Sequence, residues 1–112
     1  MIALSGKPAR RWLSGAALAL AAGCTPAPKP RAVAVQITGF VFAPATANAA
    51  PGDTVVWTNR DLVPHSATEL DGSWDSGAIA PGGTWRHVVT DGDTAGYKCA
   101  FHPNMTGRIA PR

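Results

Sequence analysis

The sequence predicts an all-β domain, an antiparallel Greek-key β-sandwich of about seven to eight strands. Short stretches in which apolar residues alternate with polar ones recur along the chain, and Gly and Pro residues separate them at short intervals. No segment of the expected domain keeps the apolar period of an amphipathic helix. The length of 112 residues allows one such domain.

Residues 1–23 are expected to be a signal peptide of the lipoprotein type. Two arginines, Arg10 and Arg11, precede a short apolar run, which is too short to span a bilayer as a mature helix. The run ends in LAAGC at residues 20–24, which resembles the lipobox of bacterial lipoproteins. The resemblance implies a lipid on Cys24, and ordinary cleavage that leaves a soluble periplasmic protein is the alternative. The arginine pair is compatible with general or twin-arginine export.

Residues 24–32 are expected to be a tether. Prolines at positions 26, 28 and 30 favour extended polyproline geometry and supply no hydrophobic face. At about 3.1 Å per residue, the Pro-rich stretch 25–31 could hold a domain about 20 Å from a membrane. The folded domain is then expected over residues 33–112.

The first strands of that domain are predicted by alternation. Val33, Val35 and Ile37 alternate with more polar residues, and Phe40 and Phe42 extend the pattern after a glycine. A Pro-Gly-Asp turn at 51–53 then leads into the β-branched and aromatic run 54–58.

The second half is divided into shorter segments by glycines at positions 72, 77, 82 and 83. Residues 85–89 alternate again, a turn follows at 91–92, and a last strand is expected through Arg108 and Ile109. So small a domain has a small core. We expect the core to consist of Phe40, Phe42, Trp57, Trp85, Val89, Tyr97 and Ile109.

The charge of the expected domain argues against a nucleic-acid partner. From residue 33 onward, five basic residues stand against seven acidic ones, so the basic stripe of a nucleic-acid-binding surface is missing.

The segment 97–105 contains the candidate metal ligands. It places Cys99, His102 and Met105 three residues apart, which offers a thiolate, an imidazole and a weak thioether donor. Two histidines and a cysteine with a long axial methionine are the ligands of a blue-copper electron-transfer site. A second histidine must therefore come from elsewhere, and the chain offers His65 and His87.

His65 is the better candidate for this ligand. It follows the predicted strand 54–58, so a loop can project its imidazole toward the 99–105 segment. His87 shares strand parity with Trp85 and Val89, which favours a structural histidine that packs against the sheet.

At these residues the chain resembles the cupredoxins, in particular the amicyanin and plastocyanin branch. The resemblance covers residues 33–109, and the spacing of His102 and Met105 is similar to that of amicyanin. The matching segments are Gly52–Asn59, Pro64-His65-Ser66, Gly72–Gly77 with Pro81-Gly82, and Tyr97–Gly107. The resemblance implies one type 1 copper ion held by His65, Cys99, His102 and Met105, and single-electron transport by Cu(II)/Cu(I) cycling.

The same resemblance implies two residues behind the ligands. In the family, the asparagine at the position of Asn59 hydrogen-bonds to the residue after the ligand cysteine, which here would be the backbone of Ala100. Phe101 stands where amicyanin has proline, so its N–H could donate to the Cys99 sulfur and raise the reduction potential.

Other functions and another pairing remain open at this point. A copper chaperone or storage protein could use the same ligands, although the chain has only two methionines. An enzyme with a Cys–His nucleophilic pair would need an orienting group and a cleft that are not evident, so we expect no enzyme. The two cysteines could instead form a disulfide in an oxidising compartment. A Cys24–Cys99 bond would tie the tether to the ligand loop, which argues against this pairing.

The sequence also leads to expectations about partners and location. We expect a monomer that docks transiently onto a redox protein through the apolar surface near His102. The protein is expected to be exported to the periplasm and to contact a membrane only through a lipid on Cys24.

Overall fold

The structure, a computed structural model, describes residues 6, 29–93 and 95–112. The predicted signal peptide and Cys24 therefore lie outside the described residues, apart from Gly6. Within the described part, no helix is long and apolar enough to cross a membrane.

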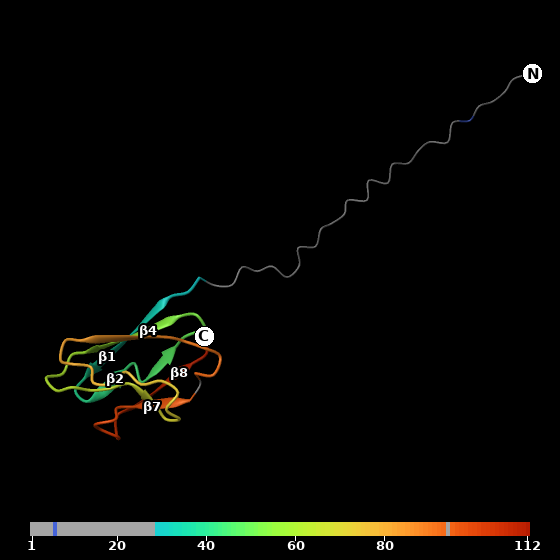
Figure 1. The fold of residues 1–112 in the computed structure, drawn as a ribbon. Helices are drawn as coiled ribbons and strands as arrows, with labels where there is room; N and C mark the ends of the chain where they lie inside the picture. Colours follow the sequence, from blue (N-terminus) through green and yellow to red (C-terminus); the bar gives the residue numbers. More distant parts are fainter. Residues whose placement is uncertain (1–5, 7–28, 94) are drawn as a thin grey trace, which may run out of the picture.

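The fold is a sandwich of two four-stranded sheets (Figure 1). It confirms the predicted all-β class and the predicted number of strands. The first sheet has the order β2 (Val41–Ala43), β1 (Ala32–Thr38), β4 (Thr54–Asn59) and β6 (Thr84–Val88). The second has the order β3 (Thr46–Asn48), β8 (Thr106–Ala110), β7 (Gly96–Lys98) and β5 (Thr68–Glu69).

The strand pairing is mixed, although the sequence predicted antiparallel sheets. β1 pairs in parallel with β4, and β3 pairs in parallel with β8, whereas the other neighbours are antiparallel. The parallel pairs arise because the chain leaves the first sheet after β2, forms β3 in the second sheet, and returns as β4. This exchange between sheets cannot be read from the alternation of apolar residues along the chain.

The core lies between the two sheets and is rich in aromatic rings. The ring of Trp57 packs against Trp74, Trp85 and Tyr97 at centroid distances of 5.4–5.6 Å. Burial raises the pKa of Tyr97 to about 12, so its phenol stays neutral. An unfolded chain ionises its tyrosines from pH about 10. Tyr97 therefore supports folding below that pH, and its contribution falls as the pH rises toward 12.

Two members of the predicted core are not fully buried. Trp85 is half-buried on β6, and Phe40 is 47% exposed. The prediction for Phe40 was wrong because Gly39 and Phe40 form a turn with positive φ angles of 59° and 60°. The turn interrupts the alternation, so the ring of Phe40 leaves the core side and lies against the imidazoles described below.

A buried carboxylate joins the chain segments at the start of β4. Asp53 accepts hydrogen bonds from the N–H groups of Arg31 and Ala50, and it pairs with the Arg112 guanidinium at 2.7 Å. The hydrogen bond from Arg112 is the main reason that the pKa of Asp53 lies well below its ordinary value. A carboxylate with a lowered pKa stabilises the fold above its ordinary pKa, and this stabilisation is lost as acid protonates it.

Candidate metal centre

Two loops, one from each sheet, form the candidate centre. The first follows β4 in the first sheet and carries His65, which forms an isolated antiparallel bridge with Ile79. The second follows β7 in the second sheet and contains Cys99 and His102. Because the β4–β5 and β7–β8 connections meet at one end of the sandwich, residues separated by more than thirty positions in sequence come into contact.

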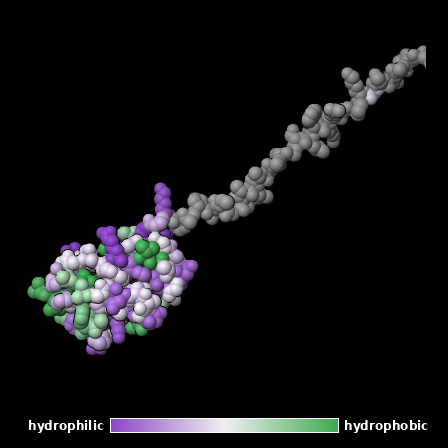
Figure 2. All heavy atoms as spheres, viewed as in Figure 1, coloured by the Kyte–Doolittle hydropathy of each residue, from purple (hydrophilic) through white to green (hydrophobic). Residues whose placement is uncertain are grey.

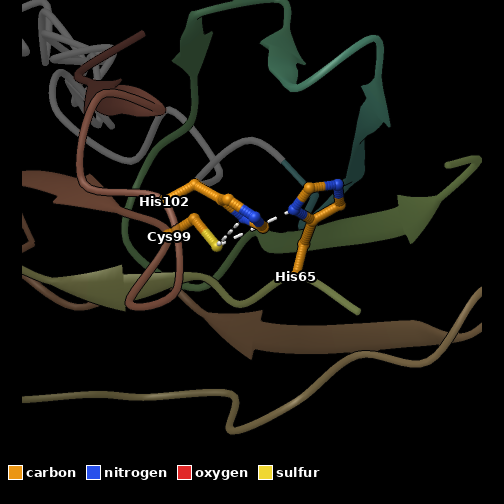
Figure 3. Close-up of side chains that lie close together, drawn as sticks. All are labelled: His65, Cys99 and His102. Carbon is orange, nitrogen blue, oxygen red and sulfur yellow. Dashed lines mark hydrogen bonds between the residues drawn. The ribbon is translucent and has the colours of Figure 1, made fainter. Parts of the chain in front are cut away.

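The structure brings His65, Cys99 and His102 together (Figure 3). Their candidate ligand atoms all lie within 4.8 Å of one another. The Cys99 sulfur is 3.8 Å from Nδ1 of His65 and 3.6 Å from Nδ1 of His102. His65 and Cys99 are fully buried, whereas His102 is partly exposed.

These distances match what a trigonal metal ion requires. Bonds of about 2.3 Å to sulfur and about 2.0 Å to nitrogen are typical of zinc. At an angle of about 120°, such bonds would place sulfur and nitrogen about 3.7 Å apart. The two observed distances between sulfur and Nδ1 lie on either side of this value. The donor set of one thiolate and two imidazoles is also the equatorial set of blue-copper sites.

Met105 lies in the same loop and is 4% exposed. Its carbonyl accepts the Cys99 N–H at 3.0 Å, and its own N–H donates to the His102 carbonyl at 2.8 Å. The two bonds close the loop that carries Cys99, His102 and Met105. Its role as the axial ligand remains a prediction.

The orientation of His65 has a clear cause that the sequence did not reveal. Its Nε2 lies 2.8 Å from the Asp61 carboxylate. Since an ionised carboxylate only accepts hydrogen bonds, Nε2 carries the ring proton and Nδ1 presents a lone pair toward Cys99. The pKa of Asp61 is lowered, chiefly by a hydrogen bond from the Phe40 N–H, so the ionised form is favoured.

Asn59 does not make the predicted bond to Ala100. Its side-chain NH₂ donates to the carbonyls of Val63 at 2.8 Å and Ile79 at 2.9 Å, and its Oδ1 accepts the Asp61 N–H. Val63 and Asp61 lie in the loop that carries His65, and Ile79 forms the bridge with His65, so all three partners lie on the His65 side of the centre. Asn59 therefore supports the His65 loop without linking it to the Cys99 loop.

Ser66 makes the link that the sequence assigned to Asn59. Its Oγ accepts the Ala100 N–H at 2.8 Å, and its backbone N–H lies 3.3 Å from the Cys99 sulfur. Ser66 directly follows His65 and stands in the segment that resembles the cupredoxins. Its position was therefore visible in the sequence, but its partners, 33 and 34 residues away, were not.

The backbone donor to the Cys99 sulfur also differs from the one predicted, which was Phe101. Among the described residues, the backbone N–H that hydrogen-bonds to the Cys99 sulfur belongs to Ser66. The Phe101 peptide lies inside a turn closed by the His102 N–H and the Cys99 carbonyl at 3.3 Å. The Phe101 ring is 54% exposed and lines a shallow depression with His102, Val63 and Pro64.

His87 lies away from the candidate centre, in agreement with the structural role expected for it. Its ring stacks on Trp74 and Trp85 at centroid distances of 4.7 and 5.8 Å. Its Nε2 lies 2.5 Å from an Asp93 carboxylate oxygen. These contacts explain an imidazole on β6 without a metal.

Comparisons with known proteins agree with this geometry at the level of the fold. No family model matches the sequence, and no curated protein matches it. Solved structures of amicyanin variants do match.

An oxidised amicyanin variant aligns with a TM-score of 0.66 at 23% identity over 72% of this chain and 82% of that one. The Cu(I) form of a second variant gives 0.67 at 23% over the same shares. A third, also Cu(I), gives 0.66 at 20% over 76% of this chain and 95% of its own. The chain therefore has the fold of amicyanin, and its resemblance to the cupredoxins is confirmed at the level of the fold.

Proposed function

We propose that this protein is a blue-copper electron carrier of the periplasm. The observation that carries the proposal is the convergence of one thiol and two imidazoles at metal-bonding separations inside an amicyanin fold. The ligands proposed are His65, Cys99 and His102, with Met105 as the weak axial group. Copper in such a donor set supplies a one-electron Cu(II)/Cu(I) couple.

The chain's own contribution is to hold these side chains in one arrangement. His65 and Cys99 are fully buried, and Met105 is nearly so, so packing limits their movement. Two hydrogen bonds tie the ligand loops together: the Ser66 N–H donates to the Cys99 sulfur, and the Ala100 N–H donates to the Ser66 Oγ. A fixed arrangement favours electron transfer, because little has to move when the oxidation state changes. Buried ligands also disfavour the copper-handling alternative, in which metal must be exchanged readily.

The route for electrons is proposed to run through the exposed side of His102. This residue is partly exposed, and the depression beside it is lined by Val63, Pro64, Ala78 and Phe101. Figure 2 shows hydrophobic side chains gathered at the left end of the domain. We propose that a redox protein docks here transiently, since encounters of this kind bury little surface.

A visible absorption spectrum tests the copper assignment. The oxidised, copper-loaded protein is expected to be intensely blue, because charge moves from the Cys99 thiolate to Cu(II), and the colour should bleach on reduction and return on reoxidation. Titration with one equivalent of copper should complete the band. A colourless copper complex, or a band that does not cycle, would contradict the proposal.

The proposed location depends on Cys24. A lipid there would place the protein in the membrane fraction, and Cys24→Ala is expected to move it to the soluble periplasmic fraction without changing the copper spectrum. One acyl chain gives only marginal binding, so stable anchoring requires more than one. Fractionation of cells that express each form measures the shift. If the unaltered protein is already soluble after export, the lipid anchor is wrong.

A further inference from the structure

The carboxylate of Asp61 accepts hydrogen bonds from His65 and from the turn that carries Phe40. Its Oδ2 lies 2.8 Å from Nε2 of His65 and 2.9 Å from the N–H of Phe40, and its Oδ1 lies 2.6 Å from the N–H of Gly39. The residues it joins are more than twenty positions apart in sequence. One side chain thus connects the turn between β1 and β2 with the His65 loop.

The contact with His65 settles which ring nitrogen faces the other ligands. Nε2 donates its proton to the Asp61 carboxylate, so Nδ1 carries the lone pair. This lone pair points toward the Cys99 sulfur, and Nδ1 lies 3.8 Å from it. The Asp61 backbone is itself fixed, since its N–H donates to Asn59 Oδ1 at 3.0 Å. Side chains that hydrogen-bond the far nitrogen of a ligand histidine fix its tautomer and ring orientation.

The contact with the turn positions an aromatic ring over the same centre. Phe40 has a φ of 60°, a conformation that residues with a side chain adopt at a cost. The hydrogen bonds from Gly39 and Phe40 to Asp61 offset that cost. In this conformation the Phe40 ring meets the rings of His65 and His102 edge-on, at centroid distances of 5.1 and 5.0 Å.

We propose that Asp61 is the positioning residue of this metal centre: it orients His65 before metal arrives and holds Phe40 as a cap over both imidazoles. The proposal rests on the proposed function, because it assigns Asp61 a role toward the copper ion expected there. The negative charge of the carboxylate, delivered through the imidazole, stabilises the more highly charged metal state. Asp61 therefore favours Cu(II) and lowers the reduction potential relative to a neutral residue.

Nitrogen-detected NMR of the metal-free protein tests the orientation without copper. In the unaltered protein, the His65 proton should reside on Nε2 and exchange slowly with water. In Asp61→Asn the amide keeps one acceptor oxygen and loses the charge, so the proton should exchange faster and the Nδ1–H form should become populated. The proposal is overturned if the unaltered protein carries the proton on Nδ1, or if Asp61→Asn leaves the exchange and the tautomer unchanged.

Metal titration and voltammetry test the consequence for the centre. Asp61→Asn should weaken copper binding roughly 10–100-fold, as other losses of such hydrogen bonds do, and should raise the reduction potential.

Phe40→Ala keeps the N–H donor and deletes only the ring. It should leave the His65 tautomer unchanged, while copper passes faster to a chelator. Equal affinity and potential in the Asp61 variant would overturn the role assigned to Asp61. Equal copper release in the Phe40 variant would overturn the cap.

Asp53→Asn is the matched control for these measurements. Asp53 also accepts two backbone N–H groups, but it precedes β4, whereas Asp61 follows it, about 20 Å of strand away. Its substitution should lower stability and leave the tautomer, affinity and potential unchanged. If both variants shift the potential alike, a general loss of structure is responsible and the proposal fails. If the NMR result holds but no copper binds, the proposed function fails and the orientation by Asp61 stands.

Discussion

Cys99→Ser is expected to abolish the blue absorption of the copper-loaded protein completely. The colour requires a thiolate bonded to Cu(II), and Cys99 supplies the thiol of the cluster of His65, Cys99 and His102. A serine hydroxyl is a hard, weakly acidic donor that gives no charge-transfer band in the visible range. Copper that still binds through the imidazoles should therefore be nearly colourless, and it should bind more weakly.

His87→Gln is the control for this experiment. It removes an imidazole that lies outside the cluster and hydrogen-bonds to Asp93, so the folded variant should keep the band of the unaltered protein. Absorption spectra recorded at equal copper occupancy compare the three proteins. A blue Cys99→Ser protein would mean that the thiol is not a ligand, and the assignment of the whole centre would fall.

The donor residues of the centre could be predicted because their chemistry and spacing are local. Cys99, His102 and Met105 stand in one short segment, and their donor types restrict the metals that they suit. His65 needed one further step, the inference that a loop after a strand can reach the same end of the sandwich. The structure brings His65, Cys99 and His102 together, and the axial role of Met105 stays a prediction.

The residues that orient these donors could not be predicted, because their hydrogen bonds join distant segments. Asp61 bonds to a turn 21 and 22 residues earlier, and Ser66 bonds to a loop 33 and 34 residues later. Asn59 was recognised as a supporting residue, but its partners depend on the path of its own loop and on Ile79, 20 residues later. Polar residues in loops have many possible partners, and the sequence does not rank them.

Phe40 shows the limit of periodicity in the fold itself. Phe40 and Phe42 alternate in the sequence, which predicts that both point inward, yet Phe40 lies in the turn between β1 and β2 and only Phe42 lies on β2. Val35, Ile37 and Phe42 are buried as predicted, and Phe40 is not. The same turn places Phe40 beside His65 and His102, so the break in the pattern falls at the candidate centre.

The largest stability effect is expected for Gly107→Ala, because β7 and β8 leave no room for a side chain there. Gly107 pairs across the strands with Tyr97. A Cβ atom at this position would lie 2.5 Å from Cζ and 2.6 Å from the hydroxyl of Tyr97. The tyrosine is fully buried and packs against Phe42 and Trp57, so its ring has little freedom to move. Overpacking of this kind costs about 1–3 kcal/mol or more.

Chemical denaturation of Gly107→Ala and Gly92→Ala measures this effect directly. Gly92 has open space around its Cα and no left-handed φ, so its substitution should change the free energy of unfolding little. Combining Gly107→Ala with Tyr97→Leu, which replaces the obstructing ring by a shorter aliphatic side chain, should cost less than the sum of the two single changes. Additive costs would show that the ring of Tyr97 is not what excludes a side chain at residue 107. Because Tyr97 lies two residues before Cys99 on the same chain segment, a ring displaced by Gly107→Ala should also shift the copper absorption band, whereas Gly92→Ala should leave it in place.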